Sequence, residues 1–299
     1  MVSPLTAIEL FSGIGAFAEA CRQTGVEVVA AFDQNEHANK VYKSNFGLQP
    51  VRRNLETLNV DDIPPANIWW MSPPCTPFSR RGEQKDDEDH RSQALAKLIK
   101  IIPERVPDFI FLENVEGFVG SKMNQQYLEA LTASGYRTIS FNICSSMFGV
   151  PMRRPRYFIA ASRTVQLVPA DLQRCQEQRS LSEFLTQNAD EKLLMPDSEV
   201  EKYRPVLNIV DPQQEDAYLI CFTRGYFKCR KASGSLIQMQ DGNVRFVAPD
   251  EILDLFGFSK QFQLPEQLPM SVQWRLVGNS VDVRAIKAVL STTNLLPSK

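Results

Sequence analysis

The sequence predicts an α/β protein built on a mostly parallel sheet with helices on both faces, accompanied by a small second domain. In the first half of the chain, short apolar runs typical of buried strands alternate with helical patterns, which indicates βαβ units. Beyond Arg163 the chain becomes polar, and Cys221–Val247 shows short strand-like runs with glycine turns. An apolar helical pattern returns over Val277–Leu290. We therefore expect a large domain over residues 1–163 and 275–299 and a small domain over residues 164–274.

Each expected strand is a run of four to seven residues rich in Val, Ile, Leu, Phe or Trp, and a turn or helix start follows it. Right-handed crossovers bring the loops after parallel strands to one edge of the sheet, so residues in those loops should meet. The expected strands are Ala7–Leu10, Val26–Phe32, Ile68–Met71, Phe109–Leu112, Ile139–Ile143 and Tyr157–Ala161. The helices expected between them lie near Ala16–Gln23, Glu36–Asn45, Gln93–Ile102 and Gln125–Ala133.

The composition argues against several classes of protein, among them zinc proteins, secreted disulfide-rich proteins and membrane proteins. The 299 residues carry a net charge of −2, so binding to a nucleic acid would depend on local basic clusters such as Arg80-Arg81. The six cysteines form no Cys-x-x-Cys pair and only two histidines are present, which argues against a zinc site and a secreted disulfide framework. No apolar run approaches the roughly 18 residues of a membrane span. We expect a soluble cytoplasmic protein without a bound metal.

The turn Pro73-Pro74-Cys75 directly follows the strand Ile68–Met71. Proline fixes its own φ and biases the preceding residue away from helix, so the thiol should sit on a stiff turn at the carboxyl edge of the sheet. Ligands of open α/β sheets bind at this edge. Taken alone, the pattern favours a strand-ending turn that buries an incidental cysteine, and a nucleophile is the alternative.

The segment Phe11–Gly15 places two glycines between a strand and a helix. Such a turn allows a ligand to approach the backbone, and Asp33, about twenty residues later at the end of the next strand, could accept hydrogen bonds from ribose hydroxyls. The third glycine of a dinucleotide site is missing, which disfavours a nicotinamide cofactor. A purely structural turn and a helix cap at Asp33 are the alternatives.

Glu113-Asn114-Val115 follows another strand, so the carboxyl group of Glu113 should lie on the same edge as Cys75. Its carboxylate could cap the next helix. Alternatively, it could be a general acid whose pKa an apolar pocket raises.

Two arginines, Arg154 and Arg156, stand two residues apart at a strand start and should therefore share one face. An anion or a base carbonyl is a natural partner for such a pair, and an internal ion pair is the alternative. Gly278-Asn279-Ser280-Val281 should open the last helix, where a cap is its simplest role.

In their order along the chain, these motifs resemble those of the cytosine-5 DNA methyltransferase family: a Phe-x-Gly-x-Gly loop, a Pro-Cys turn, Glu-Asn-Val, an Arg-x-Arg pair and a terminal Gly-Asn-Ser. The resemblance implies a Rossmann-like sheet that binds S-adenosylmethionine and releases S-adenosylhomocysteine. Two departures are Asn54, where the family often has aspartate, and Met152, where glutamine is usual. The cofactor-binding residues that the resemblance implies are Phe11, Ser12, Gly13, Ile14, Gly15, Asp33, Gln34, Asn54, Leu55, Pro74, Asn279, Ser280 and Val281.

The resemblance also implies the chemistry. Carbon C5 of cytosine is too weak a nucleophile to take a methyl group unaided. Addition of the Cys75 thiolate to C6, with Glu113 protonating or hydrogen-bonding N3, would activate C5, and loss of the C5 proton would then expel the thiol. Arg156 would hold the base O2, and Arg154 the flanking phosphate or the thiolate, whose pKa nearby positive charge would lower. The charged segment Ser79–Ser92 would close over a flipped base.

The tripeptide Cys221-Phe222-Thr223 and the small second domain are similar to the branch of the family that methylates tRNA, at cytosine 38 of the anticodon loop. Bases in single-stranded loops need little unstacking to be read. A DNA methyltransferase of restriction-modification type is the alternative, and a non-catalytic nucleic-acid binder is a third that an intact Cys75 disfavours. We expect a monomer with tRNA as its partner. The nucleic-acid contacts that the resemblance implies are Arg80, Arg81, Arg91, Cys221, Phe222, Thr223 and Arg224.

Overall fold

The computed structural model describes residues 4–22, 24–74, 92–169, 175, 177–186 and 190–293. Contacts between Cα atoms divide the chain into two compact units. The first unit comprises Met1–Ile143, Pro155–Asp171 and Ala285–Lys299. The second unit comprises Cys144–Arg154 and Leu172–Arg284.

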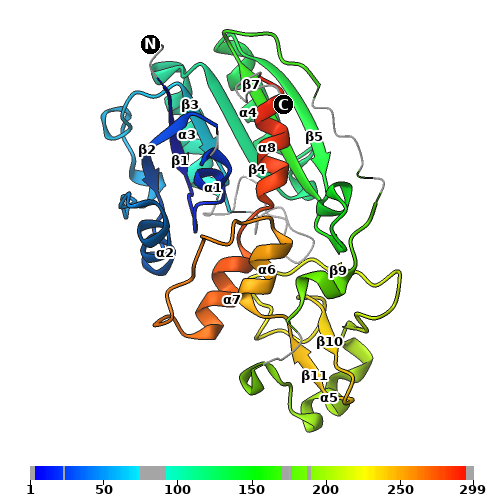
Figure 1. Ribbon diagram of the computed structural model, residues 1–299. Coiled ribbons are helices and arrows are strands. Elements are labelled where there is room, and N and C mark those ends of the chain that lie inside the picture. The colour runs from blue at the N-terminus through cyan, green and yellow to red at the C-terminus, as the bar shows by residue number, and fades with distance from the viewer. Residues whose placement is uncertain are drawn as a thin grey trace. The chain divides into compact units, whose positions relative to one another are not determined.

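A six-stranded sheet in the order β2-β1-β3-β4-β7-β5 organises the described part of the first unit (Figure 1). Strands β1 to β4 run parallel to one another, whereas β7 is antiparallel to both of its neighbours, β4 and β5. The mostly parallel α/β sheet expected from the sequence is thus confirmed, with β7 as the reversed strand. The strands are β1 (Leu5–Leu10), β2 (Val26–Phe32), β3 (Ile68–Met71), β4 (Phe109–Asn114), β5 (Arg137–Ile143) and β7 (Arg156–Ser162).

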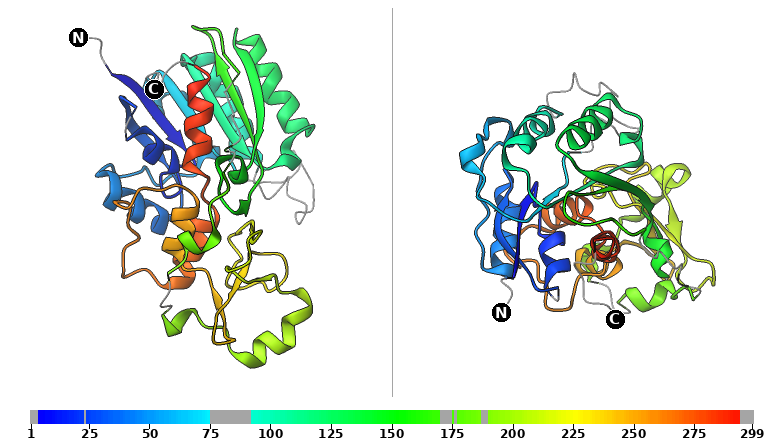
Figure 2. Two further views of the ribbon diagram at one scale, coloured as in Figure 1. Left: turned by 45° about the vertical axis from the view of Figure 1, so that its right-hand side comes forward. Right: turned by 90° about the horizontal axis from the view of Figure 1, so that it is seen from above.

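Helices cover both faces of this sheet (Figure 2). Helices α3 and α4 lie on one face, and α1, α2 and residues 285–291 of α8 lie on the other. Local capping explains two of the helix starts: Asn35 accepts hydrogen bonds from the backbone at the start of α2, and Ser121 does so for α4. No helix in the described ranges is long and apolar enough to cross a membrane. The helices are α1 (Ala16–Cys21), α2 (Glu36–Phe46), α3 (Gln93–Arg105), α4 (Lys122–Ala133) and α8 (Val283–Ser291).

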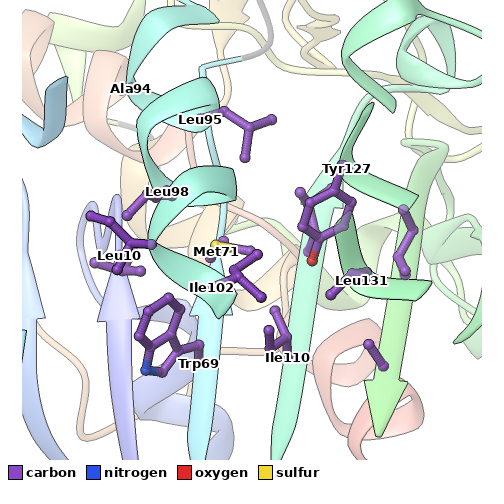
Figure 3. Close-up of a cluster of buried hydrophobic side chains, with 14 of the residues drawn as sticks. Leu10, Trp69, Met71, Ala94, Leu95, Leu98, Ile102, Ile110, Tyr127 and Leu131 are labelled. Carbon is purple, nitrogen blue, oxygen red and sulfur yellow. The ribbon is translucent and has the colours of Figure 1, made fainter. Parts of the chain in front are cut away.

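The main core of the first unit lies between the sheet and helices α3 and α4 (Figure 3). Alternate residues of β3 point to opposite faces, so Trp69 belongs to this core while Trp70 stacks on Phe17 of α1 with ring centroids 5.1 Å apart. Burial on both faces explains why the strand is a continuous apolar run. Side chains of this core include Leu10, Met71, Leu95, Leu98, Ile102, Ile110, Tyr127 and Leu131.

The described part of the second unit contains two small sheets and a cluster of aromatic rings. Its three-stranded sheet has the order β11-β10-β8, and β6 pairs with β9. A buried, bidentate ion pair joins Arg245 to Glu251, with oxygen to nitrogen distances of 2.8 and 2.9 Å. The elements are β6 (Met152–Arg153), β8 (Ile209–Val210), β9 (Leu219–Ile220), β10 (Leu236–Gln238), β11 (Val244–Phe246), α5 (Asp197–Tyr203), α6 (Pro249–Leu255) and α7 (Met270–Gly278).

The end of the chain differs from the expected single helix over Val277–Leu290. Helix α7 ends at Gly278, and α8 begins at Val283. The backbone N–H groups of Asn279 and Ser280 still bond to α7, with Leu276 and Val277 as acceptors. The Gly-Asn-Ser motif therefore closes one helix instead of opening the next.

Candidate active site

Loops that follow β1, β2, β3 and β4 meet at the carboxyl edge of the sheet in the first unit. Backbone hydrogen bonds join them: the N–H of Ser12 donates to Phe32, and the N–H of Ser72 donates to Leu10. Because β7 is antiparallel, its first residue, Arg156, lies beside the end of β4. The sheet therefore brings the glycine turn, Asp33, the Pro-Pro turn, Glu113 and Arg156 to one edge.

The glycine turn uses its two glycines differently. Gly13 and Gly15 both have positive φ, at 52° and 91°. A Cβ on Gly15 would lie 2.4 Å from the Phe46 ring and 2.9 Å from the Tyr42 ring, so this glycine allows the turn to pack on α2. A Cβ on Gly13 would meet no atom within 4 Å. The backbone at Gly13 thus borders open space where a ligand could approach.

Asp33 anchors the glycine turn. Its Oδ2 accepts a hydrogen bond from the N–H of Gly13 at 2.8 Å, and its Oδ1 accepts one from the N–H of Asn35 at 2.7 Å. Burial raises the pKa of this carboxyl group, and the two hydrogen bonds oppose that shift. Each carboxylate oxygen has a second lone pair, so Asp33 can hold the turn and still accept hydrogen bonds from a diol.

Of the other cofactor candidates, Ser12 offers a buried polar group to a ligand, whereas Gln34, Asn54 and Leu55 do not. Ser12 is buried, and its Oγ has no hydrogen-bond partner within the described ranges, which leaves a polar group for a ligand beside the turn. Gln34 is exposed. The Asn54 side chain caps a short 3-10 helix by accepting from the N–H of Glu56, and Leu55 lies in the hydrophobic core. The turn, Asp33 and Ser12 together fit the adenosine part of S-adenosylmethionine.

Glu113 and Arg156 lie side by side across β4 and β7. The Nε atom of Arg156 is 3.2 Å from Oε1 of Glu113, and their side chains are only 14% and 12% exposed. Asn114, the last residue of β4, donates from its Nδ2 to the carbonyl oxygen of Pro73 at 3.3 Å. This contact ties the Pro-Pro turn to β4. Asn114 received no role from the sequence, although its place in the Glu-Asn-Val motif was the available signal.

A second residue that sequence reasoning missed is Glu9, which lies in β1 just before the glycine turn. It is buried, and the hydroxyl group of Tyr42 donates a hydrogen bond to it at 2.9 Å. Burial raises its pKa to about 8, although bonds from Tyr42 and from the backbone of Phe17 and Ala18 oppose that shift. A charged residue inside an otherwise apolar strand was the signal that could have found it.

The nucleophile candidate and several nucleic-acid candidates lie outside the described residues. These are Cys75, Arg80, Arg81 and Arg91, together with nearly all of the charged segment 79–92. Their predicted roles stay predictions.

Arg154 and Arg156 do not share one strand, which corrects the expectation that they lie on one face. β6 ends at Arg153, and β7 begins at Arg156, because Pro155 cannot donate to a strand ladder. The guanidinium group of Arg154 is buried in the second unit, where it donates to backbone oxygens of Phe222, Gly278 and Ser280. These contacts favour a positioning role for Arg154 over direct contact with a substrate phosphate.

The Cys-Phe-Thr tripeptide lies in a turn region of the second unit. Phe222 is fully buried and packs edge-on against Tyr226, with ring centroids 4.9 Å apart. Its ring is therefore a packing element and is not available for a base, contrary to its expected direct contact. Cys221 and Thr223 are partly buried, and Arg224 is exposed.

The candidate cofactor residues near the end of the chain belong to the second unit. Asn279 is exposed, whereas Ser280 and Val281 are buried. The Oγ of Ser280 is a second buried hydroxyl group that lacks a hydrogen-bond partner among the residues described. A cofactor contact by these three residues stays a prediction.

Comparison with known proteins identifies the family and confirms the Rossmann-like methyltransferase fold. The family model described as C-5 cytosine-specific DNA methylase matches residues 5–294. A tRNA (cytosine(38)-C(5))-methyltransferase from Spodoptera frugiperda is 30% identical, covering 95% of this chain and 97% of its own. A DNA (cytosine-5)-methyltransferase from Dictyostelium discoideum is 28% identical, covering 96% and 93%. The solved structure of the Entamoeba histolytica methyltransferase EhMeth has a TM-score of 0.88 at 26% identity and covers 97% of each chain. The chain therefore belongs to the C-5 cytosine-specific DNA methylase family.

Proposed function

We propose that this protein is an S-adenosylmethionine-dependent methyltransferase that modifies carbon C5 of cytosine 38 in the anticodon loop of tRNA. Its membership of the family supports the reaction, and the Spodoptera frugiperda relative supports the substrate because its name states this activity. The tripeptide Cys221-Phe222-Thr223 adds to the case for RNA.

S-adenosylmethionine would supply an electrophilic methyl group on a sulfonium. In this proposal the turn Phe11–Gly15 borders the cofactor, and Asp33 accepts hydrogen bonds from its ribose hydroxyls. Residues 1–163 and 275–299 hold the cofactor, and residues 164–274 recognise the nucleic acid. The remaining cofactor contacts are assigned to Gln34, Asn54, Leu55, Pro74, Asn279, Ser280 and Val281.

The proposed catalytic residues act on the base. The Cys75 thiolate forms a bond to C6 while Glu113 donates a proton or hydrogen bond to N3, so that electron density moves to C5. C5 then accepts the methyl group. Loss of the C5 proton to a base restores the C5–C6 double bond and breaks the sulfur–C6 bond, which regenerates the thiolate. The proton or hydrogen bond at N3 returns to Glu113 in the same step. Arg156 orients the carboxyl group of Glu113 and binds the carbonyl oxygen O2 of the base.

The observation that carries this proposal is the contact between Glu113 and Arg156 at the sheet edge where the Pro-Pro turn emerges. An acid beside a carbonyl-binding cation matches N3 and O2, which are neighbouring atoms of cytosine. Both side chains of this pair are mostly buried, which distinguishes it from an ordinary ion pair on the protein surface.

A direct test incubates the protein with tritiated S-adenosylmethionine and either total tRNA or genomic DNA. The proposal predicts label in tRNA, and no label with Cys75→Ala. A Cys229→Ala variant, at an exposed cysteine that has no role in the proposal, serves as the cysteine control and should retain transfer. Surviving turnover in Cys75→Ala would contradict the covalent step.

DNA is the second candidate substrate, because the Dictyostelium discoideum relative is named a DNA (cytosine-5)-methyltransferase at nearly the same identity. Label in DNA alone would replace the tRNA proposal with this one. The same proposal places the reaction in the cytoplasm, where tRNA is abundant, and in a monomer, which light scattering on the purified protein tests.

A further inference from the structure

Arg154 lies between two segments of the second unit that are far apart in sequence. We name Cys221-Phe222-Thr223 the 221–223 segment and Gly278-Asn279-Ser280 the 278–280 segment. The Nη1 atom of Arg154 donates to the carbonyl oxygen of Phe222 at 2.7 Å and contacts the Sγ of Cys221 at 3.1 Å. Its Nη2 donates to the carbonyl oxygen of Gly278 at 3.2 Å and to that of Ser280. One guanidinium group thus bonds to both segments.

Surrounding residues hold the side chain of Arg154 in place. Its side chain is only 2% exposed, and its Cζ lies 4.7 Å from the centre of the Phe256 ring, which is a cation–π contact. The preceding residues form β6, which pairs in register with β9 just before the 221–223 segment. The pairing of β6 with β9 therefore fixes the backbone from which the Arg154 side chain contacts both segments.

The two segments also touch each other directly. A Cβ on Gly278 would lie 2.5 Å from the carbonyl oxygen of Thr223 and 2.9 Å from the N–H nitrogen of Arg224. Position 278 therefore requires glycine, because the backbones of the two segments are in contact there. A displacement of one segment would move the other.

We propose that Arg154 is a positioning residue that preorganises the 221–223 and 278–280 segments as one body before either ligand binds. The inference rests on the proposed function, in which the 221–223 segment belongs to the residues that recognise tRNA, and Asn279 and Ser280 contact the cofactor. Its planar fork donates to carbonyl oxygens on both sides, a geometry that the single ammonium group of lysine cannot reproduce.

Preorganisation has a measurable signature. In the native protein each ligand meets segments that are already ordered, so tRNA should change the affinity for the cofactor little. Without the guanidinium fork, the competent arrangement is populated only in part, and the apparent affinity for either ligand alone falls by that fraction. The first ligand to bind then orders both segments, because they remain in contact at Gly278, and the second ligand binds more tightly.

The test is calorimetric titration with S-adenosylhomocysteine, with and without saturating tRNA, on the native protein, Arg154→Lys and Arg245→Lys. Arg245→Lys is the matched control, because Arg245 is equally buried in the same unit but bonds to Glu251, Phe246 and Thr186. Arg154→Lys should weaken binding about tenfold, and tRNA should restore it to within about threefold of the native value. Arg245→Lys should lower the unfolding temperature. Saturating tRNA should not change the affinity of this variant for S-adenosylhomocysteine.

The inference is overturned if Arg154→Lys binds S-adenosylhomocysteine as the native protein does, if tRNA fails to rescue it, or if Arg245→Lys shows the same rescue. Gly278→Ala is a second variant that keeps Arg154 but forces the two backbones apart. It should weaken the binding of both ligands, and tRNA should not restore the affinity for S-adenosylhomocysteine, because one segment can no longer order the other. Native-like binding would contradict the inference. Failure of the proposed function would instead show in the native protein, as methyl transfer to DNA alone, and DNA would then replace tRNA in the same titrations.

Discussion

The Nε atom of Arg156 lies 3.2 Å from Oε1 of Glu113, where the end of β4 meets the start of the antiparallel β7. Both side chains are mostly buried, so the contact holds the carboxyl group of Glu113 in place beside the guanidinium group of Arg156. The register of β4 and β7 therefore fixes the direction of the carboxyl group. This contact is the part of the proposed catalytic set that the structure describes in atomic detail.

Replacing Glu113 with glutamine should slow methyl transfer by about 10²- to 10⁴-fold, since the amide cannot deliver a proton to N3. S-adenosylhomocysteine should bind as before. Single-turnover assays with labelled S-adenosylmethionine measure the rate. Glu116→Gln is the matched control because Glu116 is an exposed glutamate in the next turn. An unchanged rate in Glu113→Gln would remove this residue from the mechanism.

The two glycines of the turn should respond differently to alanine. Gly15→Ala places a Cβ against the Phe46 and Tyr42 rings at a φ of 91°, so we expect a loss of about 2 kcal/mol or more in unfolding free energy. Gly13→Ala meets no neighbour, so its stability loss should be smaller and its main effect a weaker affinity for S-adenosylhomocysteine. Denaturant unfolding and calorimetry separate the two. Equal stability losses would contradict the distinction.

Sequence patterns predicted the sheet well and the long-range contacts poorly. The six strands follow from apolar runs that are bounded by turn residues, and the shared edge follows from the parallel connections. The break between α7 and α8 was missed because Val277 and Val281 stand four residues apart, a helical spacing that hides the break at Gly278-Asn279-Ser280. The environment of Arg154 was missed for a different reason: its partners are backbone oxygens of residues 222, 278 and 280, and a carbonyl group leaves no mark on the sequence.

Glu9 should give the protein a pH-dependent stability. Its pKa is about 8 in the folded protein, against the ordinary value of about 4.5 for a glutamate side chain in the unfolded chain, so the folded state binds the extra proton between these two pH values. Its contribution is fully present below about pH 4.5 and is lost as the pH rises toward 8. Glu9→Gln should therefore flatten the fall in unfolding free energy across this window.

Guanidinium unfolding at a series of pH values measures that slope. The exposed Glu27 on the neighbouring β2 provides the control, and Glu27→Gln should keep the native slope. If Glu9→Gln keeps it as well, the buried carboxyl group is not the source of the pH dependence.

Phe222 should matter for stability before it matters for recognition. Truncating this fully buried ring to alanine should lower the unfolding free energy by about 3–5 kcal/mol, because a cavity forms beside Tyr226. Arg224→Ala, at an exposed position two residues later, should leave the unfolding temperature nearly unchanged and reduce tRNA affinity in a salt-dependent way. A Phe222→Ala variant that unfolds like the native protein would restore a direct contact role for the ring.

Methylation of cytosine 38 in tRNA is best tested by methyl transfer to matched transcripts. Each tRNA of a panel with cytosine at position 38 is paired with a transcript that differs only by uracil there, and tritium incorporation is counted after exhaustive reaction. We expect close to one methyl group per molecule for at least one cytosine 38 transcript and none for its uracil 38 partner. Equal incorporation in both, or label only in a DNA duplex, would contradict it.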